Sequence, residues 1–227
     1  MSSSGYVAKQ LRKSTDGIVS RYINRKVSTR ITNLLVRLDN PPSPDTVSIV
    51  SALVTALGGL FLATGPAWLG AVLVQLGSIL DGVDGEIARA LNKQSRGGAL
   101  FDTMLDRLAD IAVIVGLSIA ALLEGTSTVL VATLSLLAMS GDLLVTYVHC
   151  VGEKISGKHP VLVGRVPGIA SRDVRLFLVF LFGLVNKPLW ALASIAALGY
   201  LYVLAKTPEL LLYIDNSTQR LQRGPLQ

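Results

Sequence analysis

The chain has 227 residues, of which 51% are hydrophobic and only 16% are charged. A soluble domain carries about a quarter charged residues, so this composition excludes an ordinary soluble protein. The formal net charge of +6 resides mainly in segments between apolar stretches, which argues against nucleic acid as a partner. The length suits one domain.

Residues 1–45 are predicted to form a cytoplasmic arm. Within it, segment 17–39 alternates apolar and basic residues at helical spacing, which is typical of an amphipathic helix lying on an anionic membrane surface. The alternative is a solvated helix packed on a loop. Pro41 to Pro44 end the arm, and Ser43 or Asp45 can cap the helix that follows. The segment contains Ile18, Ile23, Val27, Ile31, Leu34, Leu35 and Leu38 among Arg21, Arg25, Lys26, Arg30 and Arg37.

Six apolar stretches of near-spanning length follow, and a membrane span needs about 20 mostly apolar residues. The fifth is short. The sequence therefore predicts an all-α integral membrane protein with six transmembrane helices, in a catalytic domain at 46–210 and a cytoplasmic tail at 211–227. The stretches are 47–64, 67–90, 99–123, 127–150, 174–186 and 188–205.

Lysine and arginine are distributed unevenly between the two sides of these spans. The arm, the loops at 92–98 and 151–175, and the tail are basic, whereas the intervening turns hold only Lys187. The positive-inside rule predicts a multi-pass protein of the cell membrane with both termini and the large basic loops in the cytoplasm.

The second and third stretches carry an unusual number of carboxylates for membrane helices. At 100° per residue, Asp81 and Asp84 share one helix face, and Asp102 and Asp106 lie one turn apart on another. If these faces meet, four carboxylates need cations to remain ionised. Oxygen-only ligands indicate Mg²⁺ or Mn²⁺. The alternative is structural ion pairing with Arg89 and Arg107.

The residues around these aspartates form a longer motif. It reads Asp81-x-x-Asp84-Gly85-x-x-Ala88-Arg89, then eight residues, then Gly98-x-x-x-Asp102-x-x-x-Asp106. The motif resembles the signature of the CDP-alcohol phosphotransferase family at every fixed position, and six helices are also what that resemblance implies.

The resemblance implies roles for individual positions. Asp81, Asp84 and Asp102 would ligate two Mg²⁺ or Mn²⁺ ions, and Asp106 would contact the second ion and act as general base. The CDP moiety would bind at Asp84, Gly85, Ala88, Arg89 and Gly98. The expected reaction is attack of an acceptor hydroxyl on the β-phosphorus of a CDP-alcohol, which releases CMP. A homodimer is expected by family analogy alone.

A second basic cluster lies on the same predicted side as the aspartates. Arg172 and Arg175 are three residues apart at the start of the fifth span, where they could hold a phosphate on the acceptor. Lys154 and Lys158 are further candidates. The alternative for all four is positive-inside topology with contacts to lipid headgroups.

The choice of substrates rests on a further resemblance. Segments 13–26 and 171–175 resemble those of di-myo-inositol phosphate phosphate synthases, which join CDP-inositol to inositol 1-phosphate. A phospholipid synthase that uses a CDP-linked lipid, and makes phosphatidyl- or archaetidylinositol phosphate, is the alternative. An intramembrane prenyltransferase and a cation transporter are more distant alternatives. A prenyltransferase would not need the glycines, alanine and arginine of the motif, and a transporter would distribute its carboxylates along a path through the membrane.

Overall fold

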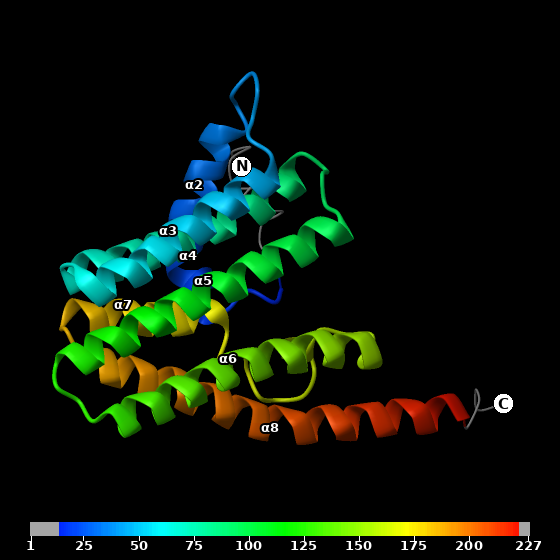
Figure 1. The fold of residues 1–227 in the computed structure, drawn as a ribbon. Helices are drawn as coiled ribbons and strands as arrows, with labels where there is room; N and C mark the ends of the chain where they lie inside the picture. The colour runs from blue at the N-terminus through cyan, green and yellow to red at the C-terminus, as the bar shows by residue number, and fades with distance from the viewer. Residues whose placement is uncertain (1–13, 223–227) are drawn as a thin grey trace.

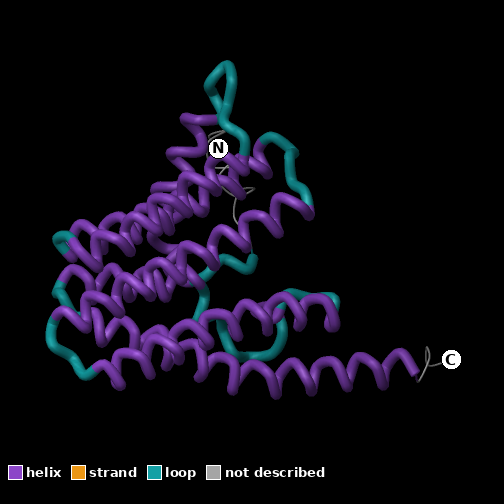
Figure 2. Tube along the Cα trace, in the orientation of Figure 1, coloured by secondary structure: helices purple, strands orange, loops and turns teal. Residues whose placement is uncertain are grey.

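The computed structural model describes residues 14–222, with side chains through residue 217. Residues 1–13 of the predicted arm and 223–227 of the predicted tail lie outside the described residues. The described part is helical and contains no strand (Figures 1 and 2). The helices are η1 (Ser20–Asn24), α2 (Arg25–Leu35), α3 (Pro44–Thr64), α4 (Ala67–Ala90), α5 (Arg96–Leu123), α6 (Thr128–Ser156), η2 (Pro160–Leu162), α7 (Arg172–Leu184) and α8 (Pro188–Gln222).

Four of the described helices are long and apolar enough to cross a membrane, namely α3, α4, α6 and α8. Helix α5 has 28 residues, but its first half carries several charged side chains, and α7 has only 13 residues. The all-helical membrane fold is therefore confirmed, while the count of six spans stays a prediction.

The ends of the helices follow from local sequence. Of the two predicted caps for α3, Ser43 is the one that accepts a hydrogen bond, from the backbone N–H of Thr46, and Pro44 occupies the first helical position. Ser95 caps α5 in the same way by accepting from Gly98 N–H. We predicted the last apolar segment at 188–205, but α8 continues to residue 222 because Pro208 does not end it and leucines follow.

The helices form two layers that α7 joins. Helices α3, α4 and α5 pack together on one side, α6 and α8 pair on the other, and α7 lies between them (Figure 1). Glycines allow close helix approach, as in other membrane bundles. Gly59 meets Gly116 between α3 and α5, and Gly141 meets Gly199 between α6 and α8.

The connections divide between the two ends of the bundle. The short turns after α3, α5 and α7 lie together at one end, on the left in Figure 1. The longer loops that precede α5 and α7 lie toward the other end. The motif aspartates are placed toward this second end, because Asp81 and Asp84 lie in the second half of α4 and Asp102 and Asp106 in the first half of α5.

The amphipathic segment buries part of its polar side, while Arg21, Lys26 and Arg30 stay exposed. Arg25, Ser28 and Thr32 are buried against α4, and all three donate hydrogen bonds to the fully buried carboxylate of Glu86, at 2.6, 2.8 and 2.6 Å. Burial by itself lowers the pKa of the Arg25 guanidinium, but Asp16 and Glu86 raise it above its usual value, so the cation persists. Tyr22 and other apolar side chains on the segment remain exposed, as expected beside lipid.

The close approach of α3 and α5 predicts that Gly116→Ala destabilises the fold. A methyl group at Gly116 would collide with the carbonyl oxygen of Gly59, and overpacking typically costs about 1–3 kcal/mol. We expect a lower melting temperature in detergent by several degrees. Gly97→Ala is the matched control, because a methyl group there meets no atom within 4 Å. Equal melting temperatures for the two variants would contradict this packing.

Candidate active site

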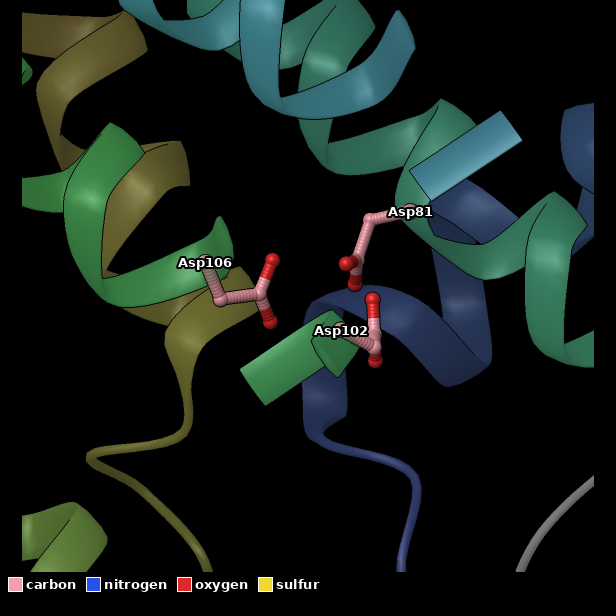
Figure 3. Close-up of side chains that lie close together, drawn as sticks. All are labelled: Asp81, Asp102 and Asp106. Atoms are coloured by element: carbon pink, nitrogen blue, oxygen red, sulfur yellow. The ribbon is translucent and has the colours of Figure 1, made fainter. Parts of the chain in front are cut away.

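Three carboxylates converge between α4 and α5. Asp81, Asp102 and Asp106 each offer an oxygen, and these oxygens lie within 4.8 Å of one another. Figure 3 shows the three side chains pointing into a common space. Helices α4 and α5 both pack against α3 and are joined by the loop 91–95, which sets the three side chains within reach of one another.

Asp84 lies close to these three carboxylates but also contacts α3. Its carboxylate accepts hydrogen bonds from the hydroxyl of Ser48 on α3 and from Gly85 N–H, and it lies within hydrogen-bonding reach of Asp102. All four predicted aspartates thus lie together. The donor set contains only carboxylate oxygens, which fits a hard divalent cation such as Mg²⁺ or Mn²⁺.

Arg172 connects this cluster to α7. Its Nη1 atom lies 2.7 Å from Asp106 Oδ1 and 3.0 Å from Asp81 Oδ1, and its Nε donates to Asp110 Oδ1 at 3.0 Å. One guanidinium therefore contacts carboxylates from both α4 and α5. The sequence placed Arg172 near the acceptor, and the structure places it beside the proposed general base as well.

A second ion-pair network is centred on Asp142 and joins α5, α6 and α7. Asp142 of α6 accepts from Arg107 at 2.5 Å and from Arg175 at 2.6 Å, and Arg107 also pairs with Asp110 at 2.8 Å. The sequence interpretation did not assign Asp142. Its signal was present, however, because a single carboxylate within an apolar span rarely occurs without a partner.

The aspartates border a large cavity of about 830 Å³. Its walls come from the arm, α4, α5, α6 and α7, and they are mainly polar. Residues that the sequence did not assign include His149, Glu153 and His159, together with the start of the arm. Among predicted residues, the cavity is lined by Asp81, Asp84, Gly85, Arg89, Asp102, Asp106, Arg172 and Arg175.

A smaller cavity of about 220 Å³ adjoins the large one. The residues predicted for CDP binding, Gly85, Ala88, Arg89 and Gly98, all line it. A methyl group at Gly98 would lie 3.0 Å from Ser95 Oγ, so the absence of a side chain there avoids a close contact at this wall of the cavity. Four residues line both cavities: Asp84, Gly85, Arg89 and Asp102. Two of the motif carboxylates therefore lie where the cavities meet, and Asp81 and Asp106 line the large cavity alone.

The predicted lysines lie elsewhere. Lys154 and Lys158 are exposed and do not line either cavity, and the Lys158 ammonium lies 5.7 Å from the ring centre of Tyr213. Their part in acceptor binding stays a prediction.

The loop between α6 and α7 is fixed to α8. The fully buried Lys206 ammonium donates to the carbonyls of Val163 and Val166, and Glu209 accepts from the Arg165 and Val166 amides. These bonds hold the loop that supplies part of the large cavity's wall. The sequence could not reveal them, because their partners are about 40 residues apart.

Comparison with known proteins gives the family of the chain. Residues 42–207 match the model of the family described as CDP-alcohol phosphatidyltransferase. A curated protein of Rubrobacter xylanophilus, named "Bifunctional IPC transferase and DIPP synthase", is 47% identical over 81% of this chain and 40% of its own length. The chain thus spans about two fifths of that relative. The archaetidylinositol phosphate synthase of Pyrococcus horikoshii is 26% identical over 74% of this chain and 82% of its own.

Solved structures give the same fold. Phosphatidylinositol phosphate synthase of Mycobacterium tuberculosis with CDP-DAG bound superposes with a TM-score of 0.66 at 22% identity, covering 82% of this chain and 94% of that one. A second crystal structure of that protein, in complex with manganese and citrate, also has a TM-score of 0.66, at 22% identity over 82% of this chain and 89% of the other. The family match over most of the chain, together with the converging motif aspartates, shows that the chain belongs to the CDP-alcohol phosphatidyltransferase family.

Proposed function

We propose that this chain is a CDP-alcohol phosphotransferase in which an acceptor hydroxyl attacks the β-phosphorus of a CDP-alcohol and CMP leaves. The observation that carries the proposal is that all four motif aspartates line the large cavity and that two of them, Asp84 and Asp102, also line the smaller one. The smaller cavity would hold the CDP moiety against Gly85, Ala88, Arg89 and Gly98. The larger one would hold the transferred alcohol and the acceptor.

The motif aspartates would bind the metal ions, and one of them would accept the proton of the acceptor hydroxyl. Asp81, Asp84, Asp102 and Asp106 would bind two Mg²⁺ or Mn²⁺ ions, which would neutralise charge on the attacking and leaving oxygens. Asp106 would also accept the proton of the acceptor hydroxyl as that oxygen bonds to phosphorus. Arg89 would bind phosphate oxygens of the donor, for which a guanidinium offers paired donors.

The two arginines of α7 would bind the phosphate of the acceptor. Arg172 is 13% exposed and borders the large cavity, so a phosphate held there would lie one side chain away from Asp106. Such a contact would set the acceptor hydroxyl within reach of the base. Arg175 would support it from the next turn, and Lys154 and Lys158 would attract the anion from outside.

The substrates that we favour are CDP-inositol and inositol 1-phosphate, with di-myo-inositol phosphate phosphate as product. The mainly polar wall of the large cavity supports water-soluble partners, and the name of the R. xylanophilus relative is in keeping with them. The alternative, a synthase that uses a CDP-linked lipid, is supported by relatives named archaetidylinositol phosphate and phosphatidylinositol phosphate synthases.

We also propose that the membrane arrangement has six spans, with α5 and α7 crossing beside the four apolar helices. Both termini and the site would face the cytoplasm, where the basic loops gather. A homodimer is proposed from family analogy.

The substrate proposal is tested with purified protein in detergent, Mg²⁺, CDP-inositol and inositol 1-phosphate, followed by phosphorus NMR. We expect CMP and a new phosphodiester to appear together, and chelation of the metal to stop both. Turnover of a CDP-linked lipid in place of CDP-inositol would support the alternative. Folded protein inactive with both donors would contradict the proposed function.

The role of Asp106 as base predicts a loss of turnover with retained binding in Asp106→Asn. General base catalysis contributes roughly 10²–10⁴-fold, so CMP release should fall by about that factor. Donor binding, measured as Mg²⁺-dependent thermal stabilisation by CMP, should persist. Asp39→Asn, at an exposed carboxylate, is the control. Near-normal turnover in Asp106→Asn would remove it as the base.

The role of Arg172 predicts a defect specific to the acceptor. Arg172→Lys keeps the charge but loses the paired donors, so the KM for inositol 1-phosphate should rise by about tenfold, the equivalent of ~1.4 kcal/mol. The KM for the donor should change much less. Lys158→Arg serves as the control outside the cavity. An equal rise in both KM values would assign Arg172 a structural role only.

A further inference from the structure

The start of the described chain forms part of the large cavity's wall. Residues 14–20, which we name the strap, end at the first residue of η1, and all of them except Val19 line the cavity together with residues of α6 and of the loop before α7. In Figure 1 this blue segment meets the beginning of α7. The strap comes from outside the family-matched region, residues 42–207, yet it contributes to the wall of the site.

One attachment of the strap leads to α4. Asp16 receives two hydrogen bonds from Arg25, at 3.0 and 2.7 Å, and the same guanidinium donates to Glu86 and to the carbonyl of Gly82. The side chains of Asp16 and Arg25 are each only 7% exposed. Since Glu86 lies between the motif residues Gly85 and Ala88, this chain of bonds joins the strap to the helix that carries the motif.

The other attachment leads to α7. The Asp173 carboxylate accepts a hydrogen bond from the backbone N–H of Ser20 at 2.5 Å. Gly17 packs so closely on Asp173 and Ser171 that a methyl group there would collide with both side chains. Asp173 lies between Arg172 and Arg175, so the strap is fastened where the acceptor phosphate is proposed to bind.

We propose that the strap, held by Asp16 and Asp173, closes the acceptor side of the cavity and keeps bulk water from the β-phosphorus. This inference rests on the proposed function. The competing reaction is hydrolysis, in which a water oxygen bonds to the β-phosphorus, its proton passes to the base, and the bond to CMP breaks. Its products are CMP and the alcohol phosphate. Asp16 and Asp173 are positioning residues, since they act through the strap.

The physical basis is competition between two nucleophiles. Water is present in bulk at far higher concentration than any acceptor, so transfer dominates only if the site excludes it. A segment held at two points by hydrogen bonds to the carboxylates of Asp16 and Asp173 can exclude water without a covalent link. Neither attachment uses the motif aspartates, so the strap can be loosened while they stay in place.

The experiment measures CMP release with and without acceptor for the wild type, Gly17→Ala and Asp173→Asn. The donor is whichever of CDP-inositol and CDP-linked lipid the wild type uses, and inositol 1-phosphate is the acceptor. In both variants, the ratio of the rate of CMP release without acceptor to the rate of transfer with acceptor should rise at least about threefold, because water enters the opened cavity. The KM for the acceptor should rise as well. Asp39→Asn should match the wild type.

The two variants distinguish an effect of opening the cavity from an effect of misfolding and from an effect of a changed charge. Gly17→Ala leaves every charge in place, and its collision displaces the Asp173 carboxylate from Ser20. Thermal unfolding and continued CMP release report that the protein is folded. An unchanged ratio of hydrolysis to transfer in both folded variants would overturn the inference alone. Absence of CMP release from the wild type with either donor would instead overturn the proposed function, and the inference with it.

Discussion

Carboxylates buried between apolar helices must be balanced by cations, and this constraint organises the described structure. Isolated charges inside a membrane protein are costly, and a buried pair is tolerated only with good geometry. Here Arg172 forms ion pairs with Asp81, Asp106 and Asp110. Arg107 and Arg175 form ion pairs with Asp142. The first turn of the short helix α7 supplies two of these cations, Arg172 and Arg175.

The distribution of polarity follows from the same constraint. Polar and charged groups gather in the cavities and between the helices, whereas leucines and other apolar side chains cover the outside, where lipid would be the solvent. The α2 segment shows this inversion most clearly, because Arg25, Ser28 and Thr32 face Glu86 while Val27 and Leu34 are exposed. What holds α2 to the bundle is therefore a buried polar network with apolar contacts around it.

The sequence predicted the features that depend on spacing and failed where distant segments meet. Helical periodicity brought Asp81 and Asp84 to one face and Asp102 and Asp106 to another, and the structure gathers all four. The apolar runs likewise predicted the long helices. In contrast, the partnership of Asp142 with Arg107 and Arg175, and the bond of Asp173 to Ser20, join residues 33 to 153 positions apart. No local pattern encodes such pairings, because they arise only when the helices pack.

The position of Lys206 along α8 bears on the depth at which the site would lie in a membrane. At about 1.5 Å per residue, the 35 residues of this helix extend over roughly 50 Å, well beyond a hydrocarbon layer of about 30 Å. If the turn before Pro188 lies at one face of that layer, Lys206, about 27 Å further along the helix, would lie near the other face. The loop that Lys206 and Glu209 fasten would then lie at headgroup level, a position at which the same cavity can receive a solute from water or a headgroup from the adjacent leaflet.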